Sequence, residues 1–331
     1  MTAPLPDAAP ANWVDRLAPA ALRPWLRLAR LDRPTGIWLL MIPGWQGIAL
    51  AAAAHGALPD VGLLIRFALG SLLMRAAGCA FNDIVDRDFD ARVSRTALRP
   101  IPAGQISVRQ AWVFVVACAL ASLAILLSLN LLCLYLGVAS LGLVAAYPFM
   151  KRITWWPQAW LGLTFNWGAL MGFAAALGGP STAMTAAIVA GAGLAGTSLS
   201  VLPQILPWPP VLLYVAAVFW TLGYDTIYAV QDMEDDALIG VKSSARRLGA
   251  HAPRAVTAFY AISLAFALLA GWASGLGARF TAAVIPVALH LAWQASRLRL
   301  DDPSRALTLF KSNTWTGLLL FAALVIGGSR G

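Results

Sequence analysis

The sequence predicts an all-α, polytopic membrane protein, and three observations lead to this fold class. Of its 331 residues, 60% are hydrophobic and only 12% are charged, whereas a soluble domain carries about 25% charged residues. Several apolar runs approach ~20 residues, the length of helix that crosses a bilayer. The runs are continuous rather than alternating, which favours helices over a barrel as the spanning structure. We therefore expect about nine transmembrane helices.

The amino-terminal residues 1–24 are predicted to form a flexible cytosolic arm. They are rich in Pro and Ala, and their two acids argue against a transit peptide. Residues 25–33 alternate Arg with Leu, so we expect this basic amphipathic segment to lie at the membrane interface. Residues 25–331 are then expected to form a single transmembrane domain.

The apolar runs give the positions of the spans. One region resists this assignment, because residues 177–209 combine a Gly-Gly-Pro sequence, an Ala-rich run and a Pro-rich tail. We expect an extracytosolic excursion there, since a tenth span would place the two acidic stretches described below on opposite sides. The nine spans are expected at residues 35–54, 61–82, 108–127, 129–149, 156–176, 210–230, 254–274, 279–296 and 307–328.

The basic residues predict the orientation of the chain. With the amino terminus inside, the residues before the first span and the even-numbered connections hold 20 of the 24 Lys and Arg residues, as the positive-inside rule requires. The formal charge of +9 therefore reflects membrane orientation, and we exclude nucleic acid as a partner. The acids of the arm favour a bacterial inner (plasma) membrane over a mitochondrial one.

Two short acidic stretches contain most of the carboxylates. Residues 82–90 hold four of the fifteen Asp and Glu residues, and residues 225–236 hold five more. Helical spacing places their main members on one face of each stretch. Like charges this close raise one another's pKa and favour a bound cation. Oxygen ligands without His or Cys favour Mg²⁺. We expect the two stretches to face each other across one metal site. Asp225 and Tyr228 are expected to support the ligands. The expected ligands are Asn82, Asp83, Asp86, Asp90, Asp232 and Asp236.

Basic residues follow each acidic stretch and predict a diphosphate site. Arg95 and Arg99 follow the first, and Lys242 follows the second. Carboxylates for a metal beside cations for phosphate oxygens are what a diphosphate requires. Acids and bases could instead pair as solvated salt bridges. This alternative is weaker for two similar stretches at equivalent helix ends, although it suits Asp88, Glu234 and Asp235 individually.

At these residues the chain resembles the UbiA superfamily of intramembrane prenyltransferases. The flanks at residues 74–79, 95–104, 147–152 and 239–243 resemble its 4-hydroxybenzoate polyprenyltransferase branch. The resemblance covers roughly residues 25–330 and departs at the longer region 177–209. Its signatures N-D-x-x-D-x-x-x-D and D-x-x-Y-A-x-x-D, with a further acid four residues on, are matched by Asn82, Asp83, Asp86, Asp90, Asp225, Tyr228, Ala229, Asp232 and Asp236.

The resemblance implies two substrates, polyprenyl diphosphate and 4-hydroxybenzoate, and an early step of ubiquinone synthesis. It also implies a ring of nine helices around a central cavity that opens to the lipid bilayer, with Asp83, Asp86, Asp232 and Asp236 carrying the catalysis. The acceptor carboxylate needs a cationic anchor near the inner membrane face. The expected anchors are Arg152, then Arg75 and Lys151, with Tyr147 positioning the substrate, although positive-inside anchoring also explains Lys151 and Arg152.

Two other functions compete with this interpretation. A member of the same superfamily could act on another aromatic acceptor, and acceptor profiling would separate the two. A divalent-cation transporter could use the same carboxylates, but transporter sites lie near the bilayer midplane. The acids here are expected at one membrane face beside phosphate-type bases, which favours the enzyme.

Overall fold

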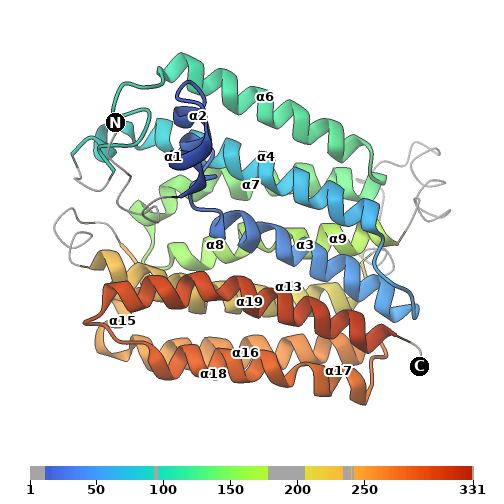
Figure 1. Cartoon of the computed structure of the whole chain (residues 1–331). Coiled ribbons are helices and arrows are strands. Elements are labelled where there is room, and N and C mark those ends of the chain that lie inside the picture. Colours follow the sequence, from blue (N-terminus) through green and yellow to red (C-terminus); the bar gives the residue numbers. More distant parts are fainter. Residues whose placement is uncertain (1–11, 93–95, 178–205, 234–239, 241, 330–331) are drawn as a thin grey trace. The chain divides into compact units, whose positions relative to one another are not determined.

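A computed structural model of the chain describes residues 12–92, 96–177, 206–233, 240 and 242–329. In these ranges the secondary structure is helical and no strand occurs, which confirms the all-α fold class (Figure 1). The chain divides into two compact units. Unit 1 comprises residues 1–40 and 68–128, and unit 2 comprises residues 41–67 and 129–331.

Seven helices in the described part of the chain are long and apolar enough to cross a membrane. This confirms a polytopic protein, but not nine uninterrupted spans. The seven contain α3 (Thr35–Ala54), α4 (Val61–Val85), α6 (Val108–Leu127), α7 (Leu131–Ile153), α13 (Trp208–Ala229), α16 (Ala252–Ala273) and α19 (Pro303–Gly328).

The two remaining expected spans are each divided into two shorter helices. The span expected at 156–176 consists of α8 (Pro157–Phe165) and α9 (Trp167–Ala176), separated at Asn166. The span expected at 279–296 consists of α17 (Ala278–Ala283) and α18 (Ile285–Arg297), and Pro286 lies in the first turn of α18. Pro lacks the N–H that a continuous helix needs. Most of the expected excursion, residues 178–205, lies outside the described ranges.

Part of the segment expected to be flexible is helical. Residues 12–33, which include that part and the expected interfacial segment, are called the amino-terminal arm from here on. It forms α1 (Trp13–Leu17) and α2 (Arg23–Leu28), and the Asn12 side chain caps α1 by accepting from Asp15 N. The Trp13 Nε1 donates to Leu31 O at 2.8 Å. The start of the arm is thus folded back on the segment that precedes the first span.

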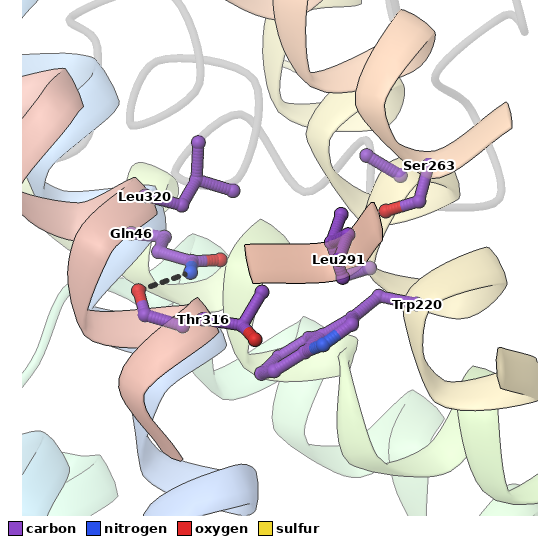
Figure 2. Close-up of a pocket in the computed structure, with 9 residues that line it drawn as sticks. Gln46, Trp220, Ser263, Leu291, Thr316 and Leu320 are labelled. Atoms are coloured by element: carbon purple, nitrogen blue, oxygen red, sulfur yellow. Dashed lines mark hydrogen bonds between the residues drawn. The ribbon is translucent and has the colours of Figure 1, made fainter. Parts of the chain in front are cut away.

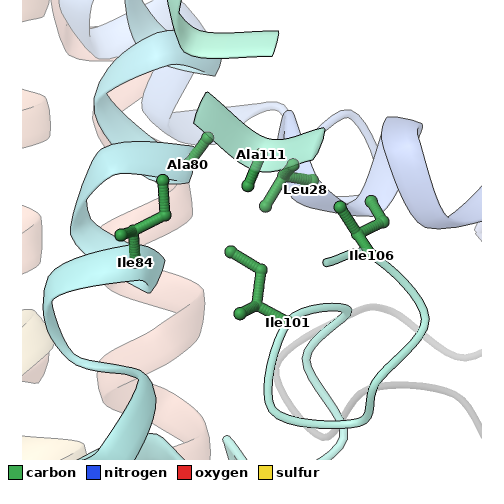
Figure 3. Close-up of a cluster of buried hydrophobic side chains, with 6 residues drawn as sticks. All are labelled: Leu28, Ala80, Ile84, Ile101, Ile106 and Ala111. Carbon is green, nitrogen blue, oxygen red and sulfur yellow. The ribbon is translucent and has the colours of Figure 1, made fainter. Parts of the chain in front are cut away.

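A small hydrophobic cluster holds unit 1 together at the end of α4 (Figure 3). Leu28 of the arm packs there against Ala80 and Ile84 of α4, and Ile101 and Ile106 enter from the connection to α6. Leu28 and Ala80 are fully buried. Leu28, which we expected to lie at the membrane interface, therefore packs in the hydrophobic core of unit 1 instead.

In unit 2, helices approach closely at small residues. A Cβ added to Gly172 of α9 would lie 2.1 Å from Gly44 O of α3, and one added to Gly47 would lie equally close to Ala169 O. Such contacts are typical of helix packing in membranes, where small residues bring backbones together. Buried side chains add hydrogen bonds between elements, such as Asn166 Nδ2 to Thr221 Oγ1 at 2.7 Å.

Candidate functional site

The first acidic motif lies where α4 ends. The backbone continues its helical path through the motif, because Asp86 N donates to Asn82 O and Asp90 N donates to Asp86 O. Asp83, Asp86 and Asp90 are buried, with 0%, 1% and 8% of their surface exposed, and Asn82 is half-buried. Asp88 is exposed and pairs with its neighbour Arg87. The helical spacing therefore predicted correctly which acids share the inner face.

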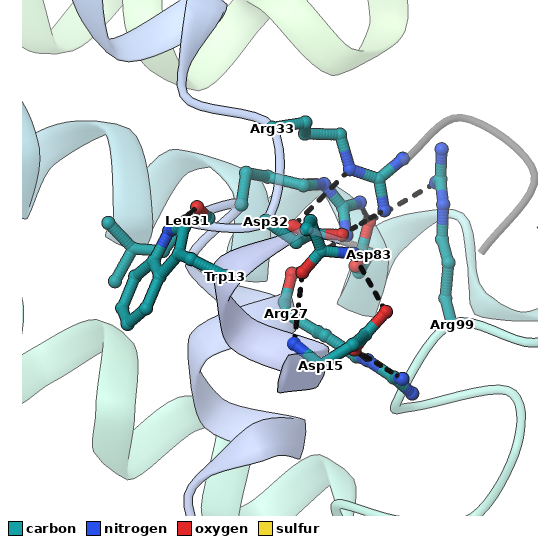
Figure 4. A network of polar contacts seen from close by, with 10 residues as sticks. Trp13, Asp15, Arg27, Leu31, Asp32, Arg33, Asp83 and Arg99 are labelled. Carbon is teal, nitrogen blue, oxygen red and sulfur yellow. Dashed lines mark hydrogen bonds and ion pairs between the residues drawn. The ribbon is translucent and has the colours of Figure 1, made fainter. Parts of the chain in front are cut away.

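Two arginines from distant segments hold the buried acids of this motif (Figure 4). Arg30 Nη2 lies 2.6 Å from Asp83 Oδ1, and Arg99 Nη1 lies 3.2 Å from the same oxygen. Arg99 Nη1 also lies 2.8 Å from Asp90 Oδ2. The sequence interpretation identified Arg99 but missed Arg30, since nothing local indicates that Arg30 reaches a residue 53 positions away.

The second oxygen of Asp83 fits a role as a metal ligand. Both ion pairs fall on Oδ1, whereas Oδ2 is buried and has no hydrogen-bond partner in the described structure. An unpaired buried carboxylate oxygen is costly, and a cation would relieve that cost. No three His, Cys, Asp or Glu side chains within the described ranges are gathered as around a metal ion. Asp236, one of the expected ligands, lies outside those ranges.

The electrostatics of Asp90 show how crowded the first motif is. Burial raises the pKa of Asp90, Arg99 lowers it, and the nearby Asp83 and Asp86 raise it again, so that it lies above its ordinary value. Burial and like charge both disfavour the ionised form. Burial together with the neighbouring carboxylates therefore outweighs the stabilisation that Arg99 gives to ionised Asp90.

The second acidic motif lies at the end of α13. The helix ends at Ala229 and tightens into the 3-10 turn η1 (Val230–Asp232). A 3-10 turn has 3.0 residues per turn rather than 3.6, so the stripe predicted from α-helical spacing does not continue unchanged to Asp232. Asp225, Tyr228 and Asp232 are half-buried. The Tyr228 ring packs on the Phe310 ring, with 4.6 Å between the centroids.

The predicted diphosphate-binding residues are distributed over both units. Arg99 belongs to unit 1, where it pairs with the first motif. Lys242 belongs to unit 2 and donates from Nζ to Ile153 O at the end of α7, at 3.1 Å. Arg95 lies outside the described residues.

Of the predicted acceptor anchors, only Arg75 belongs to the same unit as the first motif. It is half-buried on α4. A Cβ added to Gly36 would lie 2.7 Å from Arg75 Nη2, so the glycine provides the space that the guanidinium occupies. Arg152 is exposed in the last turn of α7, and Tyr147 is half-buried on the same helix. The side chain of Lys151 lies outside the described part of the structure.

Unit 2 also contains a small pocket (Figure 2). Gln46, Thr316 and Trp220 line it together with apolar side chains, and Gln46 Nε2 donates to Gly317 O. None of the residues that line it belongs to the predicted site. No local sequence pattern indicates this pocket, because residues from α3, α13, α16, α18 and α19 line it together.

Comparison with curated proteins reveals close relatives over nearly the whole chain. The mitochondrial 4-hydroxybenzoate polyprenyltransferase of Arabidopsis thaliana is 41% identical over 319 residues, which are 96% of this chain and 72% of that protein. The mitochondrial protein of the same name from Rattus norvegicus is 44% identical over 310 residues, 94% of this chain and 76% of that protein. These relatives contradict the predicted bacterial plasma membrane, which was wrong: they are mitochondrial proteins of eukaryotes.

Solved structures share the fold. A UbiA homologue from Aeropyrum pernix K1 aligns with a TM-score of 0.68 at 26% identity, covering 87% of this chain and 97% of that one. A UbiA homologue from Archaeoglobus fulgidus, bound to GPP and Mg²⁺, aligns with a TM-score of 0.61 at 19% identity, covering 91% and 99%. The model of the UbiA prenyltransferase family matches residues 40–325. The chain therefore belongs to the UbiA prenyltransferase family.

Proposed function

We propose that this protein transfers a polyprenyl group from polyprenyl diphosphate to 4-hydroxybenzoate, an early step of ubiquinone synthesis. The observation that carries this conclusion is the 41–44% identity, over most of the chain, to proteins named 4-hydroxybenzoate polyprenyltransferase. The membrane-spanning helices suit a donor whose long apolar tail resides in lipid. The new bond forms at the ring carbon ortho to the hydroxyl.

We further propose that the two acidic motifs serve one site, which would hold two Mg²⁺ ions. Asp83 Oδ2, buried without a partner in the described structure, supports this proposal. Bound Mg²⁺ would stabilise the negative charge that develops on the departing diphosphate. The residues that would hold it are Asn82, Asp83, Asp86, Asp90, Asp232 and Asp236, with Asp225 and Tyr228 supporting the second motif.

The reaction places specific demands on the protein's own side chains. As the allylic C1–O bond breaks, the diphosphate leaves with the electron pair, and Arg95, Arg99 and Lys242 supply positive charge to it. The allylic cation adds to the ring carbon, and loss of that carbon's proton restores aromaticity. Apolar surroundings exclude the water that would otherwise capture the cation.

The acceptor carboxylate is bound by a cation. Arg75 is the candidate that the structure supports best, because it lies on the helix that carries Asn82 and Asp83 and belongs to the same unit. Arg152, Lys151 and Tyr147 lie on α7 and remain candidates for orienting the ring or the carboxylate. An ionisable residue within a span is expected to have a functional role, which applies to Arg75.

The test uses membranes that contain the full-length protein, supplied with 4-hydroxybenzoate and geranyl diphosphate in Mg²⁺ or in EDTA. Mass spectrometry then looks for 3-geranyl-4-hydroxybenzoate. We expect the product with Mg²⁺, and none with EDTA or with Asp232→Asn membranes. If folded protein forms no such product, even with a longer donor, but prenylates another aromatic acceptor, the proposed acceptor is wrong.

A further inference from the structure

Arg30 has a backbone conformation that is uncommon for a residue with a side chain. Its φ is 60°, and it is the only non-glycine residue with positive φ in the described part of the chain. The left-handed region brings Cβ close to the following carbonyl oxygen. Such a conformation persists only where the surroundings determine it, and it is often found at functional sites. Contacts with the surrounding residues must therefore stabilise this backbone conformation of Arg30.

The residues just before Arg30 fix the position of its chain. Two residues earlier, Leu28 is fully buried in the cluster of Figure 3, against Ala80 and Ile84 of α4. These two residues flank Asp83 on the same helix. Arg30 Nη1 donates to Arg27 O at 3.3 Å, while Nη2 reaches Asp83. The burial of Leu28 therefore places the Arg30 guanidinium beside the Asp83 carboxylate.

Arg99 reaches the same carboxylate by an equivalent arrangement. Two residues after it, Ile101 enters the same hydrophobic cluster. Its Nη1 lies 3.2 Å from Asp83 Oδ1, the oxygen that Arg30 also contacts. With both arginines on Oδ1 and none on Oδ2, the carboxylate has one saturated oxygen and one buried oxygen without a partner in the described structure. The two contacts fix the direction in which Oδ2 points.

We propose that Arg30 is a positioning residue of the metal-diphosphate site, acting through Asp83. By occupying Oδ1 from the side of the arm, it orients the carboxylate so that Oδ2 is presented to a divalent cation. Groups that bind the far side of a metal ligand in this way typically change metal affinity or activity by about 10–100-fold when removed. The inference rests on the proposed metal site, and it gives the ordered arm a function beyond packing.

The experiment measures Mn²⁺ binding to the purified, substrate-free protein in nanodiscs by EPR. Arg30→Gln removes the ion pair, and Arg30→Gly removes it while relieving the positive φ. Arg27→Gln is the matched control, because Arg27 is an equally buried arginine of the arm that pairs with Asp15 at 2.7 Å. We expect both Arg30 variants to lose about 10-fold or more in Mn²⁺ affinity. We expect the control to bind within about 2-fold of wild type.

A second readout separates positioning from mere stability. Raising the Mg²⁺ concentration should restore turnover of Arg30→Gln toward wild type, whereas any loss in Arg27→Gln should not respond to Mg²⁺. Wild-type Mn²⁺ affinity in both Arg30 variants would overturn the proposal, and so would a wild-type protein that binds no Mn²⁺. Mn²⁺ binding that depends on Arg30, in a protein that forms no prenylated product, would overturn the proposed reaction and leave the role of Arg30 supported.

Discussion

The two acidic motifs differ in the contacts that the described residues make around them. In unit 1, the fully buried Asp83 is fixed by charges that come from segments 53 and 16 residues away. In unit 2, Asp225 and Tyr228 lie half-buried on a helix that is held by packing and neutral hydrogen bonds. Thr226 Oγ1 and Ser244 Oγ are 2.7 Å apart, and the Phe310 ring packs on Tyr228. The contacts described at Asp83 are ion pairs, whereas those described at Thr226 and Tyr228 are a hydroxyl–hydroxyl hydrogen bond and a ring contact.

This difference teaches where each motif is vulnerable. Geometry that depends on ion pairs from loops responds to single charge changes far along the chain. Geometry that depends on helix packing responds to the loss of a buried hydrogen bond or of side-chain volume, with an effect on stability. If both motifs serve one site, substituting a proposed metal ligand should reduce turnover equally, whichever motif the ligand belongs to.

The largest expected effect comes from the ligands. Asp86→Asn and Asp232→Asn should each reduce turnover by at least about 100-fold, because each removes charge that stabilises the reacting complex. Both variants should remain folded by size-exclusion chromatography and circular dichroism. Near-normal activity in either variant, measured with geranyl diphosphate and 4-hydroxybenzoate, would mean that the two motifs do not contribute equally to the reaction.

A smaller effect is expected at the acceptor anchor. Gly36→Ala places a methyl group where the Arg75 guanidinium lies, so the KM for 4-hydroxybenzoate should rise by about 10-fold, a loss of about 1.4 kcal/mol in binding. The KM for the donor should stay unchanged. Gly78→Ala, on the helix that carries Arg75 and with nothing within 4 Å of the new Cβ, is the control.

Arg152→Ala sharpens this result, because Arg152 and Arg75 belong to different units. If Arg75 is the anchor, Arg152→Ala should change the acceptor KM less than Gly36→Ala does. A larger rise in the acceptor KM for Arg152→Ala than for Gly36→Ala would mean that Arg152 on α7 binds the acceptor carboxylate.

The packing of the second motif predicts an effect on stability. Thr226→Val keeps the shape but removes the hydroxyl that is bonded to Ser244, and leaves that buried serine without this partner. We expect a loss of about 1 kcal/mol, seen as a lower Tm in detergent, with turnover per folded molecule nearly unchanged. A large loss of turnover without a change in Tm would mean that Thr226 acts in the chemistry instead.

The smallest effect concerns the arm and depends on pH. Burial raises the pKa of Asp15, but hydrogen bonds from Arg27 and Asn12 outweigh this and hold the pKa below its ordinary value of 3.8. A depressed pKa means that the ion pair stabilises the fold above pH 3.8, and that this contribution is lost as the pH falls through the lowered pKa. The protection of residues 13–31 against hydrogen exchange, taken relative to the intrinsic rate at each pH, should therefore fall only in strong acid. Asp15→Asn should show the lower protection already at pH 6.

The sequence was sufficient for the features that depend on local spacing. Continuous apolar runs predicted the seven long helices, and the i, i+3, i+4 pattern separated the buried Asp83 and Asp86 from the exposed Asp88. Pro286 was a local signal for the division of the eighth expected span into α17 and α18. The prediction followed the continuous apolar run instead. The division at Asn166 had no comparable signal, because the long-range partner of its buried Nδ2 is Thr221, 55 residues away.

The ordered arm could not be predicted for a related reason. Its Pro- and Ala-rich composition suggests disorder, and its order depends on contacts such as Trp13 with Leu31 and Arg30 with Asp83. Likewise, Arg99 was identified as a cation near the motif, but its bridging of Asp83 and Asp90 depends on the course of the connection that precedes α6. Long-range pairing of charges is not encoded in any short window of sequence.

The central claim is that both acidic motifs hold the same diphosphate through a shared cluster of metal ions. The most direct test is EPR of Mn²⁺ bound to the wild-type protein with inorganic pyrophosphate. We expect dipolar coupling between Mn²⁺ ions about 4 Å apart, as in two-metal phosphoryl sites, and loss of that coupling in both Asp83→Asn and Asp232→Asn. Uncoupled Mn²⁺ in the wild-type protein, or a signal that Asp232→Asn leaves intact, would contradict a single shared site.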